Sequence, residues 1–156
     1  MLTHRISRAI SQAMTKFSFT LALVLATLTS SAHAITFEVV GKTPFSLIKQ
    51  TRTVDLNKTV GAITVEVLRE SLGKQIQSFN GSESSILEIA GLGNHLEVIS
   101  DSKMRAYGWC YSVNGKAPEL MPDRVTLKAQ TDHLRWYYGY ALYDKGEWQA
   151  QCVPVV

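Results

Sequence analysis

Two aromatic segments with a two-residue period constrain the fold most strongly. Large apolar side chains recur at every second position in segments 107–113 and 134–142. This spacing predicts two β-strands, because successive side chains of a strand point to opposite faces. We expect the strands to be neighbours and one face of each to form the densest part of the core. The residues on those faces are Tyr107, Trp109, Tyr111 and Val113 in the first segment and Leu134, Trp136, Tyr138, Tyr140 and Leu142 in the second.

The N-terminal segment has the layout of a secretory signal peptide. An acid-free stretch with Arg5, Arg8 and Lys16 precedes the apolar run 17–28, and small residues follow up to Ala34. The apolar run is much shorter than the roughly 20 residues that span a bilayer. We therefore expect the first 34 residues to be cleaved. No cysteine near that site could carry a lipid, so the product should be periplasmic or secreted, without membrane attachment.

The charge of the chain changes once the signal peptide is set aside. The first 34 residues carry the whole net charge of +3, and the remaining 122 residues have 13 basic and 13 acidic side chains. This length suits one domain, residues 35–156, rather than two. A balanced surface gives no electrostatic reason to expect nucleic acid or an anionic membrane as a partner.

The two cysteines predict a disulfide. Cys110 and Cys152 are the only cysteines, and an even pair in an exported protein is typical of a disulfide. A catalytic pair would more often have the spacing Cys-x-x-Cys. The alternative is two free, buried thiols.

The remaining pattern predicts strands around a single helix. Thr59 can cap a helix whose apolar residues recur at helical spacing up to Gly73. This order indicates an α+β domain with one helix packed on a mixed sheet, and a β-sandwich is the alternative. Further strands are expected at 35–40, 49–56, 85–90, 95–99, 125–128 and after 146, with turns at 43–44, 80–81, 91–94, 114–115 and 144–146.

One motif resembles a known family. The segment Trp109-Cys110-Tyr111-Ser112-Val113-Asn114-Gly115 is similar to the Gly-Trp-x-Tyr-x-Val-Asn-Gly signature of the transcobalamin-like C-terminal domain family, also called domain of unknown function 4430. Segment 127–137, with Trp136, resembles the family's next strand. Where the family has a Gly-Asp turn, this chain has Ala129 to His133, of which only Asp132 matches.

The resemblance implies a β-grasp-like fold in an exported or surface-attached protein. In vertebrate cobalamin carriers, a domain of this type covers one face of the vitamin. The resemblance therefore implies the fold, and it leaves the ligand of this chain open.

The sequence offers little catalytic or metal chemistry. His95 and His133 are the only histidines after residue 34, and neither lies in a motif that frames a nucleophile. A structural zinc site needs four Cys or His at short spacings, which these residues do not provide. The segment Gly91-Leu92-Gly93 lacks the third glycine of a dinucleotide-binding loop. We expect no enzymatic activity, no metal site and no cofactor.

The candidate ligand-binding residues are Arg135, Tyr137 and Tyr143. They lie opposite the expected core face of their strand, where exposed rings beside an arginine can stack on a flat ligand or a sugar. A second layer, such as a C-terminal strand with Trp148, could instead cover them. We expect a binding domain for a small molecule or glycan. The alternative is a protein-interaction module or inhibitor in the cell envelope that uses this face or an open sheet edge.

Overall fold

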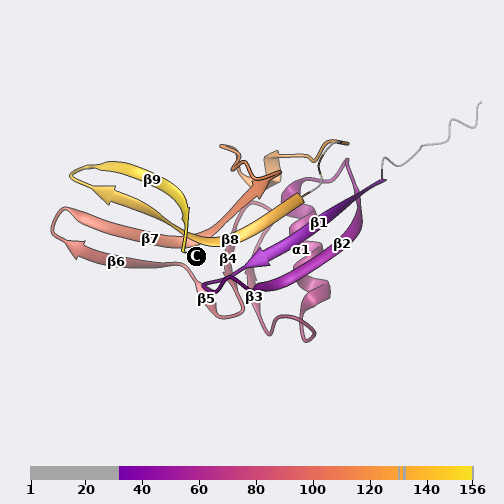
Figure 1. The fold of residues 1–156 in the computed structure, drawn as a ribbon, viewed down its shortest axis with the longest axis horizontal. Coiled ribbons are helices and arrows are strands. Elements are labelled where there is room, and N and C mark those ends of the chain that lie inside the picture. The colour runs from indigo at the N-terminus through magenta and orange to yellow at the C-terminus, as the bar shows by residue number, and fades with distance from the viewer. Residues whose placement is uncertain (1–31, 130, 132, 156) are drawn as a thin grey trace, which may run out of the picture.

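The computed structural model describes residues 32–129, 131 and 133–155, and it consists mostly of β-sheet with one α-helix (Figure 1). A large mixed sheet has the order β2-β1-β8-β7-β6, and β9 also pairs with β8. A small sheet has the order β3-β4-β5. The elements are β1 Ala32–Val40, β2 Ser46–Asp55, α1 Val60–Ser71, β3 Phe79–Gly81, β4 Ile86–Ile89, β5 Leu92–Gly93, β6 His95–Ser100, β7 Lys103–Val113, the 3-10 helix η1 Pro122–Arg124, β8 His133–Asp144 and β9 Glu147–Pro154.

Helix α1 begins and ends where its sequence predicts. The Thr59 hydroxyl accepts a hydrogen bond from the Ala62 N–H at 3.1 Å, which caps the N-terminus. Gly73 follows the helix with a φ of +71°, a conformation that favours glycine. The Trp136 indole of β8 donates to the Thr64 hydroxyl at 2.9 Å. The helix therefore packs on the centre of the large sheet, which favours the α+β prediction over a β-sandwich.

Strands β7 and β8 pair as the aromatic pattern predicts. Their antiparallel register places Trp109 opposite Tyr138 and Tyr111 opposite Trp136, so these rings share one face. We call it the helix face, because Trp136 contacts α1 there. The opposite face, which carries Cys110 and Tyr137, is called the outer face.

Only part of the helix face belongs to the core. We call the half of β7 and β8 nearer to α1 the inner half and the half farther from α1 the outer half. Leu134, Trp136 and Tyr138 are buried, whereas Tyr107 and Tyr140 are only partly covered. The 12 residues of α1 extend about 18 Å, whereas the 12 residues of β8 extend roughly 40 Å. The helix therefore cannot cover the whole strand, and the prediction that the entire face is core is wrong for the outer half.

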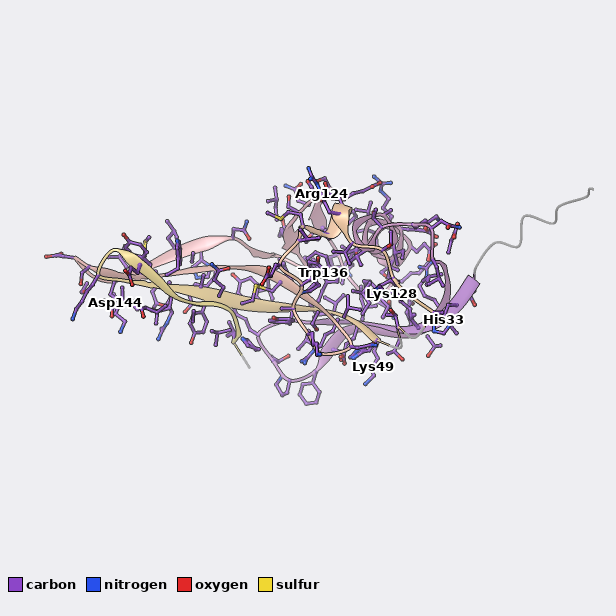
Figure 2. The ribbon with its side chains drawn as sticks, turned by 90° about the horizontal axis from the view of Figure 1, so that it is seen from above. His33, Lys49, Arg124, Lys128, Trp136 and Asp144 are labelled. Atoms are coloured by element: carbon purple, nitrogen blue, oxygen red, sulfur yellow. A yellow bond between two sulfur atoms is a disulfide. The ribbon has the colours of Figure 1, made fainter. Side chains whose placement is uncertain are left out.

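The outer halves of β7 and β8 form an arm with β6 and β9. The arm extends away from α1 and the β1–β2 hairpin (Figure 1). Figure 2 shows Asp144 at the far end of the arm and Trp136 in the body of the domain. All six residues of β6 are exposed.

Three local predictions are wrong. The turn expected at 91–94 contains strand β5, which pairs with β4. Asn80 and Gly81 lie in β3, and the turn follows at 82–85, where the Ser82 N–H donates to the Ser85 carbonyl at 2.8 Å. Segment 125–128 forms no strand. The Val125 carbonyl instead accepts from the Val60 N–H at 2.7 Å, so this backbone satisfies the helix N-terminus rather than a sheet.

The predicted signal peptide lies mostly outside the described residues. Strand β1 begins at Ala32, and its first three residues pair with Asp55, Val54 and Thr53 of β2. Cleavage after Ala34 would remove these three pairs and leave the rest of β1. Asp132, the residue that matches the family's Gly-Asp turn, also lies outside the described residues.

Candidate functional site

The cysteine pair ties the C-terminal strand to β7. Cys110 and Cys152 lie at disulfide distance, with their Cα atoms 5.7 Å apart, as the sequence predicts. The Tyr137 hydroxyl donates to the Cys152 carbonyl at 3.1 Å. The end of β9 therefore crosses the outer face of β8 above Tyr137.

The structure brings two of the three candidate ligand-binding residues together, because the Arg135 guanidinium carbon lies 5.9 Å from the centre of the Tyr137 ring, and it places Tyr143 apart from them. Tyr137 is only 8% exposed, and this burial raises the pKa of its hydroxyl. Tyr143 packs edge-on against Trp148, with ring centres 5.4 Å apart. Arg135 lies eight residues from Tyr143 on the same strand, a separation of about 26 Å. The C-terminal strand thus covers two of the candidates, which is the alternative left open by the sequence.

Arg135 belongs to a charged cluster around Glu38. The Glu38 carboxylate, whose side chain is only 12% exposed, lies 3.2 Å from His133 Nε2 and 3.5 Å from Arg135 Nε. It also accepts a hydrogen bond from the Ser46 hydroxyl at 2.7 Å and lies 3.6 Å from Lys49 Nζ. Burial alone would raise the pKa of Glu38, but the hydrogen bond and the three cationic groups outweigh it and lower that pKa. This arrangement holds β1, β2 and β8 together.

We expect Glu38→Gln to remove part of the acid sensitivity of the fold. Because the pKa of Glu38 is lowered by folding, its contribution to stability is present above the ordinary value of 4.5 and is lost as pH falls through the folded value. The substitution should reduce the free energy of unfolding by about 1 kcal/mol at pH 7. It should also flatten the dependence of stability on pH below 4.5, measured by urea denaturation across pH. An equal loss of stability at pH 2 and pH 7 would contradict this account.

A groove of about 680 Å³ lies beside the inner half of β7. Its walls come from β4 with the preceding loop, from the start of β6, from the loop between β7 and β8, and from parts of β8 (139–141) and β9 (151–152). Two exposed residues of that loop, Leu120 (58% exposed) and Met121 (64%), line it together with Leu87 and Leu96. A concave site of this volume with exposed apolar walls falls in the size range of ligand sites, roughly 300–1,000 Å³.

Two residues of the family motif hold the walls of this groove in place. The Tyr111 hydroxyl donates to the Leu120 carbonyl at 2.6 Å, and the Trp109 indole donates to the Leu92 carbonyl at 2.8 Å. The Tyr111 ring stacks on Trp136 with centres 5.3 Å apart, so it is anchored in the core. Burial raises the pKa of Tyr111, and the nearby Asp123 adds to this shift. The hydroxyl therefore stays protonated and keeps its bond to the loop.

The last residues of the motif form the predicted turn. Asn114 and Gly115 both have positive φ, 49° and 76°. Two central residues with positive φ are typical of a tight hairpin turn, which explains the Asn-Gly pair. The Val113 N–H donates to the Lys116 carbonyl at 2.9 Å and closes the turn, from which the groove loop departs.

Sequence patterns did not reveal this groove. Its apolar walls come from short pieces far apart in the sequence, 84–87 and 117–122, and each piece is too short to show by its own periodicity that it borders a groove. One signal was available: Leu120 and Met121 are two large apolar residues between Pro118 and Pro122, where a solvated loop would carry polar ones.

His95 and His133 lie in different environments. His95 stacks on Tyr107, with ring centres 4.4 Å apart, and its Nδ1 lies 3.0 Å from the Tyr138 hydroxyl. His133 lies beside Glu38. Within residues 32–129, 131 and 133–155, no group of three or more His, Cys, Asp or Glu side chains could hold a metal ion. In the same part of the chain, no helix is long and apolar enough to cross a membrane.

Comparison with known proteins adds no relative to these observations. No family model matches the sequence, and no curated protein matches it significantly. The similarity of the Trp109-to-Gly115 motif to transcobalamin-like C-terminal domains therefore stays a prediction.

Proposed function

We propose that the chain is an exported, non-enzymatic binding domain whose ligand occupies the groove beside β7. The observation that carries the proposal is the groove itself, where Leu87, Leu96, Leu120 and Met121 leave large apolar surfaces open to solvent around a concave site. Exposed apolar patches of this kind commonly mark interaction sites. The groove thus replaces Arg135, Tyr137 and Tyr143 as the proposed site.

The proposal includes a β-grasp-like fold. Support comes from the order of the elements: a β1–β2 hairpin, then α1, then the antiparallel pair β7 and β8. It also comes from the parallel pairing of β1 with β8 at the centre of the sheet. In this arrangement one helix crosses one side of the sheet, and the loops at the other end are free to form a binding site.

The proposal also places the protein in the periplasm or outside the cell. The basic, apolar and small-residue order of the first 34 residues supports export. The Cys110–Cys152 pair supports an oxidising compartment, because such pairs are rare in the cytosol.

Thermal-shift screening with a site variant tests the function. The panel consists of short apolar peptides, oligosaccharides, tetrapyrroles and flat aromatic compounds. A ligand at 100 times its Kd should stabilise the protein by about 2.7 kcal/mol. Met121→Asp, which places a charge in the apolar wall, should abolish this shift.

A matched control keeps the experiment specific. Like Met121, Phe45 is a large apolar residue and is exposed (79%), but it lies in the β1–β2 loop and does not line the groove. Phe45→Asp should therefore leave the shift unchanged. The proposal fails if no compound stabilises the wild type, or if Met121→Asp and Phe45→Asp respond alike.

A further inference from the structure

The hydrogen-bond pattern of β7 fixes which of its backbone groups point toward the groove. The Asn114 N–H donates to the His133 carbonyl, and the Lys145 N–H donates to the Ser102 carbonyl, both at 2.9 Å. The two bonds flank the two ends of the pairing between β7 and β8, which runs without a break from Lys103 to Val113. In an antiparallel pair, bonded positions alternate, so the even-numbered residues of β7 bond to β8 and the odd-numbered residues point to the other edge.

Two partners use parts of that other edge, and a gap remains between them. Strand β6 pairs with β7 from Lys103 to Tyr107, and Val113 bonds to Lys116 in the hairpin turn. Trp109 and Tyr111 lie between these contacts. No described strand pairs with β7 there, and no described backbone bond outside the ladders involves either residue.

This gap opens into the groove. Trp109, Cys110 and Tyr111 all line it. The alternation of bonded positions turns the N–H and carbonyl groups of Trp109 and Tyr111 to the edge of β7 that borders it. Tyr111 is a buried residue, and buried backbone groups without partners are costly. A ligand that supplies two donors and two acceptors in strand spacing removes that cost.

We propose that the groove binds an extended peptide segment of a partner protein, which adds a short strand to the edge of β7 at Trp109 and Tyr111. The inference rests on the groove being the binding site, as proposed above. A polypeptide strand is the ligand that presents N–H and carbonyl groups at alternate positions on one edge. Neither a glycan nor a tetrapyrrole offers that pattern.

The walls define the chemistry of the segment. The large apolar side chains exposed in the groove are those of Leu87, Leu96, Leu120 and Met121, so the segment should carry apolar residues where it meets Leu120 and Met121. Glu119 adds one exposed acidic side chain to the lining. Proline is excluded at the positions that bond to β7, because it has no N–H. The peptide must contain at least three residues, because two residues that bond to β7 are separated by one that does not. The side chains of the two bonding residues lie on the same face as Trp109 and Tyr111.

Peptides with selectively methylated backbones test this inference. The probes are seven-residue peptides in which valine, leucine or phenylalanine alternates with threonine, and binding is followed by thermal shift and tryptophan fluorescence. At least one should bind the wild type. N-methylation at each position in turn should then weaken binding about tenfold at two positions that are two residues apart, and about twofold or less at the position between them.

The outcomes separate this inference from the proposed function. If every methylation weakens binding equally, or none does, strand addition is wrong. The same conclusion follows if no alternating peptide binds while a sugar or tetrapyrrole binds in a Met121-dependent manner, but the groove would then remain the binding site. If Met121→Asp binds every probe as the wild type does, both proposals fail. Far-ultraviolet circular dichroism of the variant shows that it is folded.

Discussion

Replacing Cys110 and Cys152 together by serine is expected to lower the free energy of unfolding by about 4 kcal/mol. The pair closes a loop with a sequence separation of 42, and opening that loop returns conformational entropy to the unfolded chain. The pair also holds the end of β9 over Tyr137, which adds a native-state contribution. Urea denaturation of the oxidised protein and the double variant measures the difference.

Reduction of the wild type provides the control for this result. Dithiothreitol should bring the wild type to the stability of the double variant and leave the variant unchanged. If oxidised wild type and double variant unfold at the same urea concentration, the disulfide has no energetic role and the account of the C-terminal strand is wrong.

Trp136→Ala is expected to lower the free energy of unfolding by roughly 3–5 kcal/mol, the range for truncating a buried aromatic residue. Trp136 is only 2% exposed, stacks on Tyr111 and donates to the Thr64 hydroxyl of α1. Its loss leaves a cavity between helix and sheet and removes the hydrogen bond that the Thr64 hydroxyl accepts, although this hydroxyl still donates to the Val60 carbonyl. Chemical denaturation with far-ultraviolet circular dichroism as the readout measures the loss.

The arm supplies a matched tryptophan. Trp148 is 49% exposed on β9, so Trp148→Ala should cost about 1 kcal/mol or less. The comparison separates a core tryptophan from a surface one with the same chemical change. Equal losses for the two variants would show that the helix does not pack on Trp136 as described.

Local patterns predicted the strands and the helix well where each residue's surroundings follow from its neighbours in sequence. The two-residue period of Trp109, Tyr111, Trp136 and Tyr138 correctly gave one shared face. Thr59 correctly marked the start of α1, because its capping bond spans only three residues. The prediction of a tight turn was correct where a positive φ favours Asn or Gly, as at Asn114.

Properties that depend on distant segments could not be predicted in the same way. The extent of the core on β8 depends on the length of α1, which is remote in sequence. The cover over Tyr137 depends on the return of β9, and the partner of Arg135 is Glu38 on β1. Alternation identified the face of these side chains, but alternation carries no information about what lies above that face.

The groove could not be predicted for the same reason. Its floor is an edge of β7 that β6 leaves unpaired after Tyr107, and its walls come from 84–87 and 117–122. The register between β6 and β7 decides where pairing stops, and the two-residue period of β7 continues unchanged past that point. The sequence did raise an open sheet edge as an alternative, without identifying which edge.

We expect a peptide strand to pair with β7 at Trp109 and Tyr111. Amide hydrogen exchange in isotope-labelled protein, measured by NMR with and without the alternating peptide, tests it most directly. The account predicts that exchange of the Trp109 and Tyr111 amides slows on binding, whereas the Gly108 and Cys110 amides, which bond to β8, change little. Unchanged exchange at Trp109 and Tyr111, with perturbations confined to the outer face at Arg135 and Tyr143, would contradict it.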